Sequence, residues 1–155
     1  MNSLIVNEEL TMNVPEGFHI MTEEEMAQLK YFDKPMWLIT DPDRHMIFTV
    51  SWRKSGLAAL LLKPKDIIKK MEPQLGKAMK PYDYGFQSFL QADMGGQPAE
   101  GFLYAYNSKG IDMCGAAFSV KKGKTFYYIY CYMREELLAE SRPVLEEIMQ
   151  GASWT

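Results

Sequence analysis

The densest group of side chains that could carry chemistry is the segment Asp41-Pro42-Asp43-Arg44-His45. Two carboxylates and an imidazole at this spacing could serve as a general acid and base, or as ligands of a metal ion. The same order of residues is typical of a type I turn, which selects Asp at its first position and Pro at its second. We therefore interpret the segment as a turn, and an enzyme built on Asp41, Asp43 and His45 is the third of three functional hypotheses.

The rest of the sequence offers no catalytic signature. It contains no Gly-x-Ser-x-Gly nucleophile elbow, no His-Glu-x-x-His zinc motif and no Gly-x-x-x-x-Gly-Lys phosphate loop. His19 stands alone and suits a surface or half-buried position, and Arg53-Lys54-Ser55-Gly56 is only a weak candidate for an anion-binding nest. We predict that the protein is not an enzyme and that it holds neither a metal ion nor a cofactor.

The two cysteines, Cys114 and Cys131, are too few for a disulfide framework and lack the Cys-x-x-Cys spacing of metal and redox sites. If Lys122-Gly123 forms a two-residue hairpin loop, Lys121 pairs with Lys124 and Cys114 lies opposite Cys131. We expect two free, buried thiols in a reducing compartment, with a regulatory disulfide as the alternative.

Length and composition indicate one globular domain over residues 1–155. The net charge of −3 has the wrong sign for attraction to nucleic acid. The longest apolar run, Leu57 to Leu62, is far shorter than the roughly 20 residues that cross a bilayer. Met1 to Leu10 lacks the basic and apolar regions of a secretory leader. We therefore predict a cytoplasmic protein that neither binds nucleic acid nor inserts into a membrane.

Hydrophobic periodicity predicts the elements that must position any site. The first half of the chain predicts two hairpins and two helices: strands at 4–6, 10–14, 36–40 and 46–53, a helix at about 23–31 that opens with a Thr22/Glu25 capping box, and a helix at 64–80 that Pro73 should kink. The second half predicts four successive antiparallel strands at 82–92, 99–107, 111–120 and 125–133, and a helix at 134–150 that Pro143 should break or restart.

Strands that are apolar on both faces need cover on both sides. The predicted fold class is therefore α+β, with an antiparallel sheet of about six to eight strands between helices on both faces. Alternation along the strands gathers seven rings on one face: Phe102, Tyr104, Tyr106, Phe126, Tyr128, Tyr130 and Tyr132. With Ser108-Lys109 as a loop, Phe102 opposes Gly115 and Tyr104 faces Met113.

The ring-rich face has two interpretations. Aromatic rings on a sheet commonly pack beneath a covering helix. Tyrosine is also enriched at interfaces, and the 12 methionines suit either a core or an adaptable binding surface. We take Tyr104, Tyr106, Tyr128 and Tyr130 as the candidate interaction surface. The six lysines between Lys63 and Lys80 and the five glutamates between Arg134 and Gln150 form opposite charge patches, which we interpret first as solvated helix faces.

The order of elements resembles the Mog/PsbP-like family of α/β/α sandwiches. The residues that carry the resemblance are Val14-Pro15-Glu16-Gly17-Phe18, like the family's Pro-x-Gly-aromatic entry, and Leu145-Glu146-Glu147-Ile148-Met149 leading to Ser153-Trp154, like its closing helix. Phe18 stands where the family often has Trp, and Gly151-Ala152 precede Ser153. The resemblance implies a non-enzymatic module, because relatives bind a small GTPase, bind a photosystem, or act as bacterial adaptors and chaperones.

Three functional hypotheses follow. The first is a protein-interaction or adaptor module whose partner is another protein. The second is a small-molecule or lipid-tail binding protein that uses an aromatic, Met-rich cavity on the sheet. The third is the enzyme built on the Asp41 segment.

Overall fold

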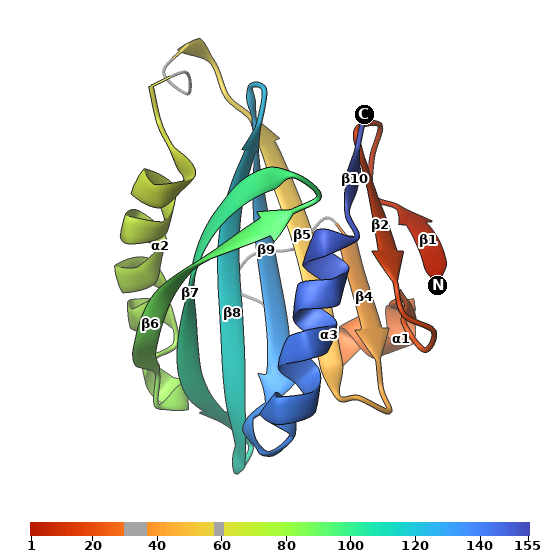
Figure 1. The fold of residues 1–155 in the computed structure, drawn as a ribbon. Helices are drawn as coiled ribbons and strands as arrows, with labels where there is room; N and C mark the ends of the chain where they lie inside the picture. The colour runs from red at the N-terminus through yellow and green to blue at the C-terminus, as the bar shows by residue number, and fades with distance from the viewer. Residues whose placement is uncertain (30–36, 58–60) are drawn as a thin grey trace.

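The computed structural model describes residues 1–29, 37–57 and 61–155 (Figure 1). The strands are β1 (Asn2–Ile5), β2 (Leu10–Val14), β3 (His19–Ile20), β4 (Trp37–Asp41), β5 (Met46–Lys54), β6 (Gly85–Met94), β7 (Gln97–Ser108), β8 (Ile111–Lys122), β9 (Thr125–Arg134) and β10 (Ser153–Trp154). The helices are α1 (Glu23–Ala27), α2 (Pro64–Ala78) and α3 (Leu138–Gln150), with 3-10 turns η2 (Lys80–Tyr82) and η3 (Glu135–Leu137).

The larger sheet has seven strands in the order β3-β4-β5-β9-β8-β7-β6, and every neighbouring pair is antiparallel. In Figure 1, α3 crosses the near face of this sheet, and α2 lies on the other side, where it packs mainly against β7 and β8. The predicted antiparallel sheet between helices is therefore confirmed, because each face of the central strands has its own helical cover.

Each face of the large sheet has its own core. The α3 side buries a large cluster that includes Phe48, Phe118 and Ile148. The α2 side buries a smaller cluster of Ile68, Met79, Phe102, Tyr104 and Ala117. Because side chains alternate across a strand, these two clusters use alternate residues of β7, β8 and β9.

A second sheet of three strands, in the order β1-β2-β10, joins the two ends of the chain. Trp154 donates its indole N–H to the carbonyl of Met94 at 2.7 Å. The backbone N–H of Thr155 donates to the carbonyl of Glu9 at 2.9 Å. The opening hairpin is confirmed, but its pairing with the last residues of the chain is a tertiary contact that local patterns do not encode.

Both predicted hairpin registers in the second half are wrong by two residues. Lys122 pairs with Thr125 and Ser108 pairs with Ile111, so the two-residue loops are Gly123-Lys124 and Lys109-Gly110. Gly123 has φ +60°, and Lys109 and Gly110 have φ +53° and +82°. Hairpin loops of this length need positive φ at the first or at both central positions, and that need selects these loops.

A shift of two residues keeps each side chain on its predicted face. The ring-rich face therefore survives, but its cross-strand pairs change: Tyr104 opposes Gly115, and Gly115 opposes Tyr132. Cys114 opposes Met133 instead of Cys131. Both cysteines are buried and free, as expected.

The helices differ from the sequence prediction at their ends and at one proline. The capping box of Thr22 and Glu25 is present, and α1 ends at Ala27, while the predicted end at Tyr31 lies outside the described residues. Helix α3 runs through Pro143 without a break. A proline removes one helical bond, here to the carbonyl of Ala139; because Pro143 and Ala139 are both exposed, water can replace that bond. Helix α2 is one helix that contains Pro73, and the kink predicted there stays a prediction.

Candidate functional site on the sheet face

The Asp41 segment is a structural turn. The buried Asp41 carboxylate accepts from the Arg44 guanidinium and from the backbone N–H of Asp43, the latter at 3.1 Å. The same guanidinium donates to the carbonyl of Glu16 at 2.9 Å. His45 is exposed, and among the described residues its ring forms no hydrogen bond to either carboxylate. The segment therefore holds the β4–β5 hairpin to the chain before β3, as the turn interpretation predicts.

His19 lies on the surface, as predicted, but it is not isolated. Its Nε2 lies 2.9 Å from the carboxylate of Glu25, the residue that closes the α1 capping box. The hydrogen bond from the Thr22 backbone N–H, followed by that of His19, lowers the pKa of Glu25. In the part of the chain that the structure describes, no cluster of three or more His, Cys, Asp or Glu side chains could hold a metal ion.

The four tyrosines of the predicted interaction surface occupy different depths. Tyr104 is completely buried at 0% exposure beneath α2, whereas Tyr106, Tyr128 and Tyr130 are half-buried. The Tyr104 ring lies 5.4 Å from the Tyr84 ring and 5.7 Å from the Tyr106 ring, centroid to centroid. Tyr104 thus belongs to the core, and the use of this face for interaction stays a prediction for the other three.

Gly115 leaves the space on the sheet that the Tyr104 ring occupies. A Cβ at Gly115 would stand 2.5 Å from the Tyr104 hydroxyl oxygen, closer than real Cβ contacts come. The Tyr104 hydroxyl itself is buried and has no hydrogen-bond partner in the described structure. Burial, followed by the neighbouring tyrosines, raises the pKa of Tyr104 well above its usual value.

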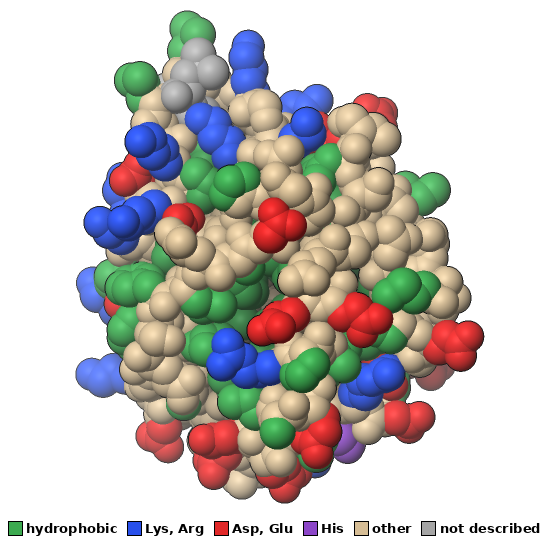
Figure 2. Space-filling model, viewed as in Figure 1, with side chains coloured by type: hydrophobic (Ala, Val, Ile, Leu, Met, Phe, Trp, Pro, Cys, Tyr) green, Lys and Arg blue, Asp and Glu red, His purple; other side chains and the backbone are tan. Residues whose placement is uncertain are grey.

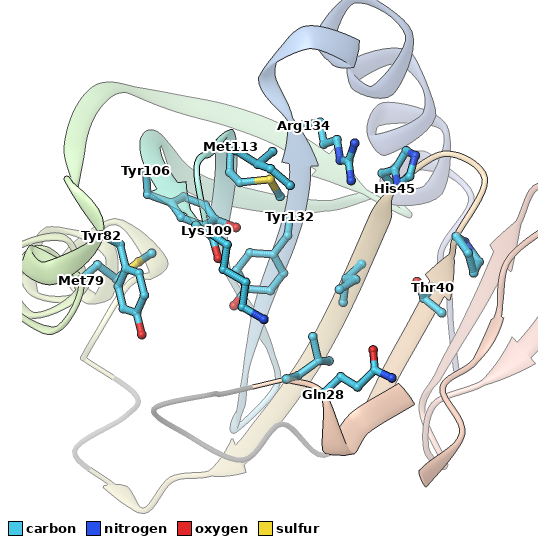
Figure 3. A pocket seen from close by; sticks show the side chains of 15 residues that line it. Gln28, Thr40, His45, Met79, Tyr82, Tyr106, Lys109, Met113, Tyr132 and Arg134 are labelled. Carbon is cyan, nitrogen blue, oxygen red and sulfur yellow. The ribbon is translucent and has the colours of Figure 1, made fainter. Parts of the chain in front are cut away.

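Beyond the end of α2, the same sheet face forms a pocket with a volume of about 730 Å³. Its apolar lining comes from several separate elements and turns and includes Ile47, Met79, Tyr106, Ile111, Met113 and Tyr132. Gln28, directly after α1, borders it on one side, and Met79 and Tyr82 border it on the other (Figure 3). Leu29 also lines it. A volume of this size lies within the roughly 300–1,000 Å³ that is typical of ligand pockets.

The charge of the pocket is one-sided. Lys109 and Arg134 line it, whereas none of its described lining residues is Asp or Glu. Lys109 lies in the β7–β8 loop and Arg134 at the end of β9 (Figure 3). Among the described residues, the carboxylate of Glu136, outside the pocket, lies 3.5 Å from the Arg134 guanidinium. The described lining of this pocket thus carries positive charge in a chain with a net charge of −3.

Sequence reasoning found part of this site. Alternation along the strands identified Tyr106, Tyr132 and, by the same parity, Met113 as residues of one face. It missed Ile47 and Lys109. Ile47 reaches the site only through the pairing of β5 with β9, which local patterns do not encode. The signal for Lys109 was available: it is the residue before Gly110 in a two-residue hairpin loop, where both residues take positive φ.

Solved structures of other proteins share the fold described above. PsbP (CyanoP) from Synechocystis sp. PCC 6803 matches with a TM-score of 0.68 and 9% identity, covering 94% of this chain and 86% of that chain. LpqN, which is involved in cell envelope biogenesis of Mycobacterium tuberculosis, matches with a TM-score of 0.61 and 15% identity, covering 94% and 83%.

A protein from Bacteroides thetaiotaomicron VPI-5482 matches with a TM-score of 0.61 and 13% identity over 94% of this chain but 45% of that chain. No family model matches the sequence, and no curated protein matches it significantly. None of the described helices is long and apolar enough to span a bilayer. At these identities the structural matches establish the architecture: the chain has a PsbP-like fold.

Proposed function

We propose that this chain is a non-enzymatic adaptor module that holds an apolar segment of a partner protein, carrying negative charge, in the pocket on its sheet face. The observation that carries the proposal is the pocket itself, with apolar side chains such as Ile47 and Met113 in its lining and no Asp or Glu among its described lining residues. The family resemblance in the sequence points in the same direction, toward binding without catalysis.

The lining explains why a protein segment is a suitable occupant. Tyr106, Tyr132 and Met113 combine apolar surface with adaptable shape, which are the properties of side chains at protein interfaces. Lys109 and Arg134 would then meet acidic side chains of the partner. Charges at the rim of an interface mainly set specificity and association rate, and the buried apolar contacts provide most of the affinity.

The test uses two lysines of the same kind. Lys109 and Lys124 are both exposed and both lie in two-residue hairpin loops, but only Lys109 lines the pocket. Proteins that bind the purified chain in an extract of its source cells are quantified for wild type, Lys109→Glu, Ile47→Glu and the control Lys124→Glu. We expect Lys109→Glu and Ile47→Glu to lose one or more partners that the control Lys124→Glu retains. If recovery of every bound protein is the same for all four chains, the pocket is not the adaptor site.

A small molecule with an apolar body and an anionic group is the second candidate, and the pocket volume of about 730 Å³ favours it. Native mass spectrometry of the purified chain would then show a co-purifying mass that disappears with Ile47→Glu. Two naphthalene dyes separate the contributions of charge and apolar contact: 8-anilinonaphthalene-1-sulfonate is anionic and N-phenyl-1-naphthylamine is neutral. We expect Lys109→Glu to weaken binding of the anionic dye alone.

A cytoplasmic location remains part of this proposal. Two free, buried thiols suit a reducing compartment, and fractionation of the source cells followed by detection of the chain tests it directly.

A further inference from the structure

The two edges of the seven-stranded sheet differ in how they are protected. One edge is β3, which has only two residues, and a very short strand offers little to a pairing partner. The other edge is β6, which has ten residues. A bulge interrupts the β6–β7 ladder between Phe86 and Ser88, and from Ser88 to Met94 the ladder is regular.

Beyond this bulge, the edge strand β6 has little of the usual protection against pairing. Natural edges are blunted by lysine, proline, bulges or a covering segment. The strand Gly85–Met94 contains no lysine and no proline, and Asp93 is its one charged residue. Among the described residues, the backbone groups of Ser88 to Asp93 have no partner outside the ladder with β7. This stretch therefore presents a row of backbone donors and acceptors to solvent.

Two exposed phenylalanines continue the α2-side core out to this edge. The Phe89 ring lies 6.5 Å from the buried Phe102 ring and 4.8 Å from the Phe86 ring, centroid to centroid. Phe86 is 43% exposed and Phe89 is 55% exposed. Strand β6 thus combines an open backbone edge with uncovered aromatic surface on the face that carries α2.

One stripe of α2 passes the start of β6 and carries two lysines beside Glu72. The Glu72 carboxylate accepts from the hydroxyl of Tyr84, the residue directly before β6, at 2.9 Å. Lys69 and Lys65 lie one and two helical turns before Glu72, on the same stripe of the helix. Both lysines are exposed, and neither has an ion pair in the described structure. Figure 2 shows Lys and Arg side chains along this side of the molecule.

We infer that β6 is a docking edge for an extended, acidic segment of a partner protein. The segment would add as an eighth strand through main-chain hydrogen bonds to Ser88–Asp93, as in other cases of strand addition. Its apolar side chains would cover Phe86 and Phe89, and its carboxylates would meet Lys65 and Lys69. A second copy of this chain is a poorer occupant, because antiparallel pairing of two β6 strands in one continuous sheet would bring two basic α2 helices to the same face.

This docking edge is separate from the pocket. Phe86 and Phe89 do not line the pocket, and no pocket-lining residue belongs to β6. The edge can therefore be tested without assuming the proposed adaptor function of the pocket.

The experiment selects binders from a random dodecapeptide display library on the purified full chain, and measures enriched peptides by fluorescence anisotropy. We expect the enriched sequences to alternate apolar and acidic residues, and hydrogen exchange to show new protection of the β6 amides. Reversal of both stripe lysines, Lys65→Glu with Lys69→Glu, should weaken binding by about tenfold, since attraction at two exposed pairs becomes repulsion.

The matched control reverses Lys70 and Lys77, which are exposed lysines of the same helix on a different stripe, so its change in net charge is identical. This control should change the peptide affinity less than about twofold. Phe89→Ser should weaken peptide binding, whereas Ile47→Glu in the pocket should leave the peptide affinity unchanged. The proposal is overturned by enriched peptides without an acidic excess, by equal effects of the two double reversals, by protection at the pocket in place of β6, or by failure to enrich any peptide. A concentration-dependent dimer that Phe89→Ser abolishes would assign the edge to a second copy and overturn it as well.

Discussion

Replacement of Tyr104 by Phe should stabilise this protein. The Tyr104 side chain is completely buried, and its hydroxyl has no hydrogen-bond partner in the described structure. A buried hydroxyl without a partner costs roughly 1–3 kcal/mol of desolvation. Removal of the oxygen leaves the ring in place against Tyr84, Phe102 and Tyr106. We expect the free energy of unfolding to rise by about 1 kcal/mol, after a small loss of packing around the missing atom.

The opposite result is expected at Tyr127, which provides the matched control. Tyr127 is also completely buried, but its hydroxyl donates to the carboxylate of Glu9 and accepts from the side-chain amide of Asn7 at 2.9 Å. Tyr127→Phe deletes the same atom and leaves both partners unpaired, so the free energy of unfolding should fall by about 1–2 kcal/mol.

The assay is urea denaturation of wild type, Tyr104→Phe and Tyr127→Phe at neutral pH, followed by tryptophan fluorescence. For a chain of this size, each kcal/mol corresponds to roughly 2–4 °C in the melting temperature, which gives an independent check. If Tyr104→Phe lowers the free energy of unfolding by 1 kcal/mol or more, the hydroxyl has a partner and the reasoning from its isolation is refuted. Equal losses for the two variants would lead to the same conclusion.

Three further predictions concern the same sheet. Gly115→Ala should lower the free energy of unfolding by about 3 kcal/mol, because the new Cβ would stand 2.5 Å from the Tyr104 hydroxyl oxygen. A decrease below about 1 kcal/mol in urea denaturation would contradict that packing. Cys114 and Cys131 should react with Ellman's reagent only after unfolding, since both are buried; rapid reaction of the native chain would show that the sheet opens. Burial also raises the pKa of both thiols, so the folded state keeps protons that the unfolded chain releases. The free energy of unfolding should therefore be constant below the usual thiol pKa of 9.0 and fall as the pH rises above it. A flat profile of that free energy from about pH 8 to 10.5 would exclude this linkage.

The sequence by itself determined the elements of this protein and the faces of its strands. Alternation along 99–107, 111–120 and 125–133 predicted three long strands, and a two-residue shift in register left every ring on its predicted face because the side-chain period of a strand is two. The Thr22/Glu25 capping box and the Asp41 turn were also readable, since both depend on neighbours within a few residues.

Local signals were insufficient where two interpretations satisfied the same pattern. Either of two adjacent residue pairs could have formed each hairpin loop, and the choice depended on the positive φ that the loop requires at Gly123 and Lys109. Pro143 predicted a break in the last helix, but a single missing bond at an exposed turn is tolerated when the rest of α3 packs on the sheet.

Only the tertiary structure decided which surfaces remain for binding. The pocket exists because β5 pairs with β9, which brings Ile47 beside Tyr132. Helix α2 covers Tyr104 next to the pocket, and the chain after α1 borders the pocket opposite the end of α2. The open edge exists because β6 is the last strand in the sheet, a place that no local pattern specifies. Periodicity fixes which way a side chain points, but strand order and helix placement depend on contacts between residues far apart in the chain, and those contacts determine what is covered and what stays open.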